Sequence, residues 1–234
     1  MVKNILILLL LLGVGLIAFD IFGAFTENKE LSPTAAYYAE NAAHEVGAAN
    51  LVTAIVVTYR GLDTLGEVSI LFLTAAIISF MLKFRKEEEM EASDLRPASE
   101  LFITATQVFT PIILIMGIYI FLNGHLTPGG GFQGGAVIAS AFLLMLMAKP
   151  RLQLSHRVIA RVESISGISY VILGVLGIAF AGGFLDNRVL SLGSFGELMS
   201  AGIIPFIYSF IGLKVGAELS NIIGTMSNLQ KENK

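Results

Sequence analysis

The stretch Gly124-His125-Leu126-Thr127-Pro128-Gly129-Gly130-Gly131-Phe132-Gln133-Gly134-Gly135 lies between two apolar segments of this 234-residue chain. Lipid offers no hydrogen bonds to a backbone, so a helix-breaking stretch of this kind must lie at an interface or be sheltered by protein. Glycine permits positive φ angles and proline stops helix propagation. Residues Pro128, Gly129, Gly130 and Gly131 therefore predict a compact bend between two helices.

The composition indicates a membrane protein. Hydrophobic residues make up 55% of the chain and charged residues 14%, against about 25% charged in soluble domains. The mean hydropathy is +0.77. Segments 5–25 and 165–185 are mostly apolar over about 20 residues, the length that a helix needs to cross about 30 Å of hydrocarbon. We predict an all-α, multi-pass protein of the cell membrane.

Several classes of protein are excluded. The chain has no cysteine, which rules out disulfides, thiolate iron–sulfur ligation and cysteine-based zinc sites within it. Its three histidines are scattered along the sequence, so we predict no metal site and no cofactor, and any redox centre belongs to a partner. No basic and aromatic patch suggests nucleic-acid binding, and the glycine run lacks the Lys-Ser or Lys-Thr ending of a phosphate-binding loop.

We expect about seven transmembrane helices, three in a first unit and four in a second. Segment 5–25 lacks an Ala-x-Ala cleavage pattern, which favours a retained helix over a signal peptide. Ser32-Pro33 predicts the start of a short interfacial helix with Ser32 as its cap. Segment 47–82 would be about 54 Å long as one helix, so we expect it to break near Gly61 into two crossings.

Charged residues divide the chain into two units. Residues 85–100 form the predicted linker, between a first membrane unit at 1–84 and a second at 101–225, and a polar tail follows at 226–234. The four spans expected in the second unit are 101–122, 135–147, 165–185 and 200–223.

The orientation follows from lysine and arginine in short loops, which favour the cytoplasm. Two loop regions carry these residues. Lys83 lies just before the linker and Arg85, Lys86 and Arg96 lie within it, and the loop after the fifth helix carries Lys149, Arg151, Arg157 and Arg161. Two crossings separate the two loops, so both can be cytoplasmic, with the C-terminus inside and the glycine bend outside. Three crossings in the first unit place the N-terminus outside, whereas two place it inside.

The interruption at residues 60–67 carries three charges, Arg60, Asp63 and Glu67. On a continuous helix all three share one face. Unpaired charges in lipid would cost several kcal/mol, so they are expected to form a paired cluster that faces protein or water. Two interpretations are open: an ion-handling cluster, or an ordinary solvated turn at Gly61 and Gly66.

The last predicted helix has a lysine, Lys214, close to its midpoint, with Glu218 four residues later and Asn221 seven residues later. These residues form a polar stripe on an otherwise apolar helix. A lysine in this position suits a proton relay, because its protonation responds to burial and to nearby anions. A static Lys214–Glu218 pair that orients helices is the alternative.

His125 lies in the glycine stretch. With an unperturbed pKa of about 6.5 it suits a proton carrier. It is equally suited to hydrogen bonding with free carbonyls of the bend.

The run Gly124-His125-x-x-Pro128-Gly129-Gly130-Gly131-Phe132-x-x-Gly135, followed by residues 136–147, resembles the signature of the MnhB family, one of the subunits of the Mrp-type sodium/proton antiporters. The resemblance covers about residues 100–225. The first unit, with Gly47-Ala48-x-Asn50-x-Val52 leading to residues 59–67, is similar to the C-terminal region of the large subunit of those antiporters. It is also similar to a small separate subunit of archaeal membrane-bound hydrogenases and related sulfur-reducing complexes. The chain therefore resembles a fusion of two neighbours.

The resemblance implies a non-catalytic membrane subunit of a module that translocates Na⁺ and H⁺. Its implied partners are other antiporter-like subunits, membrane lipid and, in respiratory complexes, a redox arm with iron–sulfur subunits. It makes Asp63, Glu67 and His125 candidate site residues, whereas Arg60, Lys214 and Glu218 rest on membrane energetics. The alternatives are a structural adaptor with no ion path and a component of a stand-alone Mrp antiporter.

Overall fold

The computed structural model describes residues 2–24, 31–85, 98–149, 152 and 155–232. All regular structure in these ranges is helical, as the sequence predicts. Six of the described helices are long and apolar enough to cross a membrane: α1 (Val2–Ala24), α4 (Gly61–Arg85), α5 (Glu100–Leu122), α6 (Gly131–Ala148), α7 (His156–Phe180) and α8 (Ile204–Glu232). The chain is a multi-pass membrane protein.

The chain divides into two compact units, Met1–Tyr37 and Tyr38–Lys234. Helix α1 accounts for most of the first unit, and no residue of its span Lys3–Gly23 is buried within the chain. Helix α2 (Pro33–Glu45) begins where the sequence predicts a helix. The Ser32 hydroxyl accepts a hydrogen bond from the backbone nitrogen of Ala35 at 3.3 Å, so Ser32 caps this helix.

The crossing expected within residues 47–60 is not formed, and this prediction is wrong. The chain instead forms α3 (Leu51–Thr53), which continues directly into the π-helix η1 (Ala54–Tyr59). These residues rise at most about 14 Å, less than half of a bilayer. Asn50 caps the start of this short helix, and the helical bonding ends at Arg60. The expected count of about seven spans therefore falls to six among the described residues.

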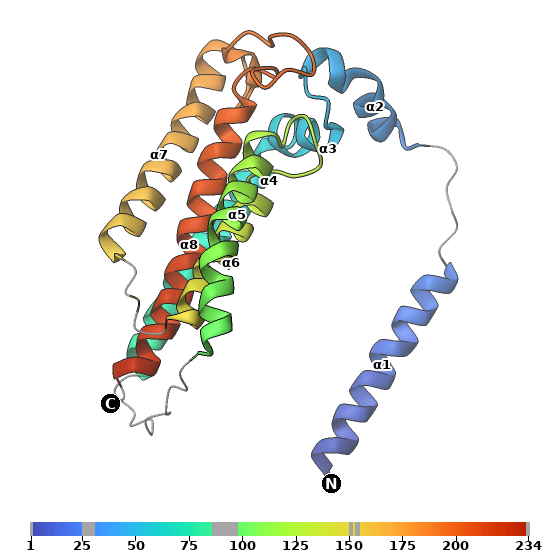
Figure 1. Cartoon of the computed structure of the whole chain (residues 1–234). Coiled ribbons are helices and arrows are strands. Elements are labelled where there is room, and N and C mark those ends of the chain that lie inside the picture. Colours follow the sequence, from blue (N-terminus) through green and yellow to red (C-terminus); the bar gives the residue numbers. More distant parts are fainter. Residues whose placement is uncertain (1, 25–30, 86–97, 150–151, 153–154, 233–234) are drawn as a thin grey trace. The chain divides into compact units, whose positions relative to one another are not determined.

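Helix α8 is the central helix of the second unit and packs against α4, α5, α6 and α7 (Figure 1). Glycines let three of these helices approach closely. A Cβ atom on Gly135 of α6 would lie 2.8 Å from the carbonyl oxygen of Gly212 in α8. A Cβ atom on Gly134 would lie 2.6 Å from the carbonyl oxygen of Gly117 in α5. Close backbone approach of this kind stabilises helix pairs in lipid through van der Waals contact.

Several helix bounds differ from the predicted ones. Helix α6 begins inside the glycine run, at Gly131, and α7 begins at His156, well before residue 165. Helix α8 continues to Glu232, so most of the predicted polar tail is helical. The predicted linker falls mainly on residues 86–97, outside the described residues, and the division into units at 1–84 and 101–225 stays a prediction.

Candidate functional site

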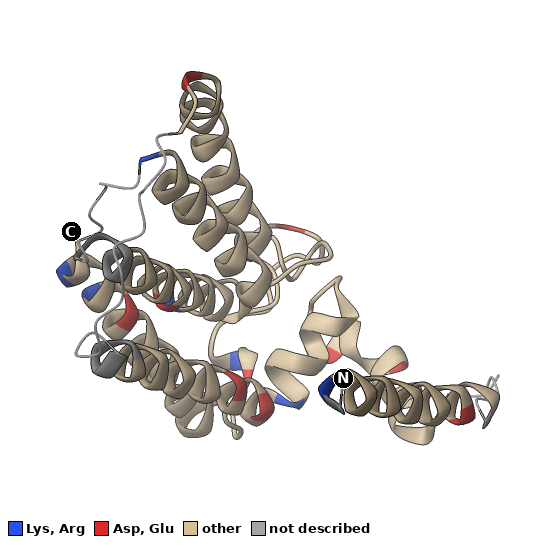
Figure 2. Ribbon diagram, turned by 90° about the horizontal axis from the view of Figure 1, so that it is seen from below, with Lys and Arg blue, Asp and Glu red and all other residues tan. Residues whose placement is uncertain are grey.

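A groove lies between α4 and α7, within their candidate membrane spans. The groove has a volume of about 360 Å³. Its lining comes from three helices: Leu65, Val68, Ser69 and Phe72 of α4, Glu163, Ser164, Gly167, Ile168, Tyr170 and Val171 of α7, and Lys214 of α8. We call it the α4–α7 groove. Few charged residues are seen along the ribbon of the chain, most of which is tan in Figure 2, so a lysine in this groove is unusual.

Lys214 and Glu218 form a buried ion pair, with Nζ 2.6 Å from Oε1. Lys214 is 8% exposed and Glu218 is fully buried. The ammonium group also lies 5.0 Å from the centre of the Phe72 ring, a cation–π contact. Gly167 of α7 lies beside it, since a Cβ atom there would be in ordinary van der Waals contact with Nζ, at 3.5 Å. Lys214 is about 15 Å along the axis from Ile204, near the middle of its span, as the sequence predicts.

The second carboxylate oxygen of Glu218, Oε2, is buried and has no hydrogen-bond partner among the described residues. The hydroxyl of Tyr170, a residue that lines the groove, is also buried and also has no hydrogen-bond partner among the described residues. A buried oxygen with a free lone pair can accept a proton, a water molecule or a cation. The Lys214–Glu218 pair can therefore exchange a proton internally and still offer an acceptor at Oε2.

The charges at residues 60–67 do not form one cluster. Arg60 and Asp63 make an ion pair with each other, and more than half of each side chain is exposed. Glu67 is exposed within this chain and acts electrostatically on Tyr170. The fold thus brings Glu67 to the side of α4 near the α4–α7 groove and leaves Arg60 and Asp63 outside its lining.

The glycine corner is held by Asn50, the residue that caps the start of α3. Its side-chain nitrogen donates hydrogen bonds to the carbonyls of Gly124 and Thr127, each at 2.9 Å. The Thr53 hydroxyl donates to the Gly124 carbonyl at 2.6 Å and accepts from the Tyr208 hydroxyl at 2.9 Å. The predicted bend is present, with Gly129 and Gly130 at φ 157° and 153°, and these side chains bind carbonyls of the corner.

His125 is fully buried in this corner. Its Nε2 lies 3.3 Å from the carbonyl oxygen of Glu197, in the connection between α7 and α8. Burial lowers the pKa of the His125 imidazole below its usual value, although backbone carbonyls, that of Glu197 first, act in the opposite direction. Nδ1 has no partner among the described residues. The Nε2 contact is thus to a carbonyl outside the bend.

The α7–α8 connection bears a second polar cavity, of about 590 Å³, lined by residues that include His44, Glu45, Asp186 and Arg188. Arg188 pairs with Asp186 and lowers the pKa of that carboxyl group. Asn187 is buried beside it and donates to the carbonyls of Val46 at 2.6 Å and Ala201 at 3.1 Å.

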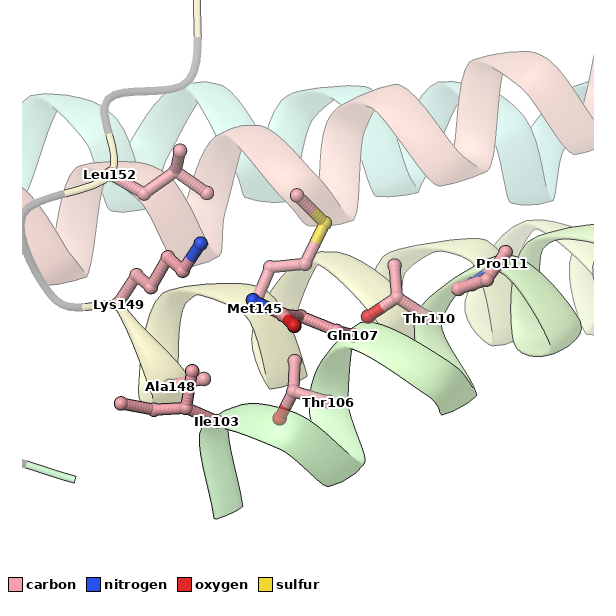
Figure 3. A pocket seen from close by; sticks show the side chains of 9 residues that line it. All are labelled: Ile103, Thr106, Gln107, Thr110, Pro111, Met145, Ala148, Lys149 and Leu152. Atoms are coloured by element: carbon pink, nitrogen blue, oxygen red, sulfur yellow. The ribbon is translucent and has the colours of Figure 1, made fainter. Parts of the chain in front are cut away.

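A third cavity, of about 270 Å³, lies between α5 and α6 (Figure 3). The hydroxyls of Thr106 and Thr110 are buried there and have no partner among the described residues. Most of its lining is apolar. Met145 of α6 lines it, and so does Lys149, the residue that follows α6. No group of three or more potential metal-ligating side chains occurs in the described part of the chain.

Sequence reasoning missed Asn50, Asn187, Glu163 and Tyr170 as site residues. Asn50 stands in the motif at residues 47–52, but its partners are more than 70 residues away. Glu163 lies before the predicted start of its helix, so its place inside a span was not visible. A helix that begins at His156 would have shown it.

The fold and the groove together define a class: an all-helical membrane protein whose bundle encloses an ionisable pair. Residues 101–221 match the family described as a domain related to the MnhB subunit of Na⁺/H⁺ antiporters. Residues 3–98 match MbhE, a family of MBH subunits. The chain belongs to the MnhB-related family, with an MbhE segment before that domain, and the resemblance inferred from the sequence is confirmed.

Three similar proteins are informative. An uncharacterized protein of Methanocaldococcus jannaschii is 35% identical over 197 residues, which cover 73% of this chain and 74% of the relative. A probable K⁺/H⁺ antiporter A/B subunit of Rhizobium meliloti is 30% identical over 60% of this chain, but the match spans only 16% of that protein. A chain in the structure of the membrane-bound sulfane sulfur reductase, an archaeal respiratory membrane complex, is 39% identical, with a TM-score of 0.81 and coverage of 97% and 98%.

Proposed function

We propose that this chain is a non-catalytic membrane subunit of a multisubunit Na⁺/H⁺ translocating module, coupled to a respiratory redox complex of the hydrogenase or sulfur reductase kind. The family of residues 101–221 and the similarity to a chain of the sulfane sulfur reductase complex support this function. Its partners are then other antiporter-like membrane subunits, together with a redox arm that carries iron–sulfur centres.

The Lys214–Glu218 pair beside the α4–α7 groove is the observation that carries the proposal. A buried ion pair is costly to desolvate, and a purely structural helix contact gains little from it. Two further polar residues lie between the pair and the start of α4: Tyr170 in the groove lining, and Glu67, which acts electrostatically on Tyr170. We propose that Glu67, Lys214 and Glu218 take part in the ion path. The exposed Arg60–Asp63 pair lies at the same end of α4, and His125 supports the path by holding the corner.

The test replaces Lys214 in the assembled complex and measures ion movement. In inverted membrane vesicles, Lys214→Met and Glu218→Gln are each expected to lower redox-driven Na⁺ or H⁺ transport at least about tenfold, with subunit composition unchanged. Lys149→Met is the matched control, because Lys149 is exposed and lies outside the groove.

Removing one partner of a buried pair destabilises a protein by about 3–5 kcal/mol, so a single variant can fail to assemble. The double variant Lys214→Met/Glu218→Gln removes both charges and keeps the test valid. Normal transport in an assembled double variant would contradict the ion path and favour a structural adaptor, whose best support is the closed 2.6 Å contact of the pair.

We further propose that the C-terminus is cytoplasmic. The basic residues around the end of α6 and the start of α7 support this orientation. Six crossings then place residue Lys3 on the cytoplasmic side as well, which is the arrangement expected for two crossings in the first unit.

A further inference from the structure

The α4–α7 groove is open on the side that faces away from α8. Ser69 and Ser164 on its two walls are exposed, and the Phe72 ring is 51% exposed. The groove lies within the spans Gly61–Met81 and His156–Phe180. If lipid alone covered it, polar side chains would face hydrocarbon, which offers them no hydrogen bonds.

The charges of the groove are not balanced within the chain. Lys214 is neutralised by Glu218. Glu163 is half-buried in the α7 wall and acts electrostatically on Glu218. Neither Glu163 nor Glu67 forms an ion pair with any described residue of this chain. The groove and its margin therefore carry an excess of negative charge inside membrane-spanning helices, and carboxylates in such positions are normally paired.

The walls of the groove carry small residues. Ser69, Ser164 and Gly167 are small residues that let a helix backbone approach closely. Tyr170 adds an independent sign of an occupant, because its hydroxyl is buried, lines the groove and has no partner among the described residues. A neighbouring helix with a polar side chain would satisfy this hydroxyl.

We propose that, in the assembled complex, a membrane-spanning helix of another subunit lies in the α4–α7 groove and places a lysine or arginine beside Glu163 or Glu67. The inference rests on the proposed function only in taking this chain to be one component of a larger complex. The covering helix would also close the polar side of Lys214 off from lipid, so that the ion path lies between two subunits.

The experiment places the photoreactive residue p-benzoylphenylalanine at Ser164 in the complete complex. The expected product is a cross-link to one other subunit, within a membrane helix that contains lysine or arginine. Ile115 of α5, which is 68% exposed and lies outside the groove, is the control position. It should not cross-link to that helix. Lipid adducts alone at Ser164 would overturn the proposal.

A charge exchange then tests the pairing. Glu163→Lys is expected to lower the yield of assembled complex about tenfold. Changing the lysine or arginine of the cross-linked helix to glutamate should restore that yield. Glu163→Gln, which removes the charge without reversing it, should have the smaller effect. Unchanged assembly of Glu163→Lys would contradict the basic partner.

The two proposals fail separately. Loss of transport in Lys214→Met with an intact Ser164 cross-link supports both of them. Normal transport in Lys214→Met with an intact cross-link removes the ion path and leaves the covering helix in place.

Discussion

At the scale of single residues, His125 is notable because a fully buried imidazole must remain neutral or be paired. Its Nε2 lies within hydrogen-bond distance of the backbone carbonyl of Glu197. Besides burial, only backbone groups shift the pKa of the imidazole. A proton carrier needs access to water or to a second carrier, so this geometry favours a role in holding the corner over the carrier role. The neutral ring then links the glycine corner to the α7–α8 connection.

The pH dependence of stability follows from this burial. The unfolded imidazole has a pKa of about 6.5, and burial lowers the pKa of His125 in the folded chain. The unfolded chain therefore binds more protons between the two pKa values, so the stabilisation is complete above about pH 6.5 and is lost as the pH falls through the folded pKa. We expect the unfolding temperature of the complex to fall by a few degrees from about pH 7.5 to about pH 5.5.

His125→Gln should reduce that fall, because glutamine keeps a polar group in the site and does not titrate in this range. His44→Gln changes an exposed histidine and serves as the control. An unchanged pH dependence in His125→Gln would show that other groups cause the fall.

At the scale of helices, backbone contact between glycines determines how α5, α6 and α8 pack. Gly134→Ala would place a methyl group 2.6 Å from the Gly117 carbonyl oxygen and 3.0 Å from the Phe121 Cβ atom. Overpacking of this kind costs about 1–3 kcal/mol. We expect a lower unfolding temperature for the detergent-purified complex.

Gly66→Ala is the matched control, since a Cβ atom at Gly66 of α4 meets nothing within 4 Å. There the higher helix propensity of alanine should give a gain of up to about 1 kcal/mol. Similar losses in both variants would mean that the α5–α6 contact is not the cause.

The helices also show where sequence reasoning works and where it does not. Helix α5 is predicted to within one residue from its long apolar run, and the structure shows that Ser99 caps its start. Helix α6 begins at Gly131 although glycine disfavours helix. A larger residue would not fit there, because a Cβ atom would lie 2.6 Å from Ile211. The false crossing before Arg60 has the hydropathy of a span, but its capping Asn50 and its short length depend on contacts far away in the sequence.

The candidate site was predictable only in part. Lys214 and Glu218 are four residues apart on one helix, so their pairing follows from local geometry. The nearness of Glu67 to Tyr170, and of Phe72 to Lys214, depends on how α4, α7 and α8 pack. Spacing along one helix holds no information about these contacts between helices.

At the scale of the whole molecule, the number of crossings decides the side of the membrane on which each end lies. Six crossings would put Asn4 and Ser227 on one side, which we propose is the cytoplasm, and Ser194, between α7 and α8, on the other. The chain has no cysteine, so single cysteines can be introduced without background. In intact cells, an impermeant maleimide should label Ser194→Cys only.

Permeabilised cells should also give labelled Asn4→Cys and Ser227→Cys. Seven crossings would instead place Asn4 on the side of Ser194. Labelling of Asn4→Cys in intact cells would therefore contradict the six-span arrangement.

The hydrogen bonds around the glycine corner join chain segments on both sides of residues 86–97. Asn50 and Thr53 come before that stretch, whereas Gly124, Thr127 and Tyr208 follow it. A further hydrogen bond of this kind runs from the Asn187 side chain to the carbonyl of Val46. These buried side chains therefore hold the segments before and after that stretch together, in addition to the chain that connects them. We expect that two separately translated halves would associate through the same contacts, and that joining them in one chain fixes their ratio at one to one.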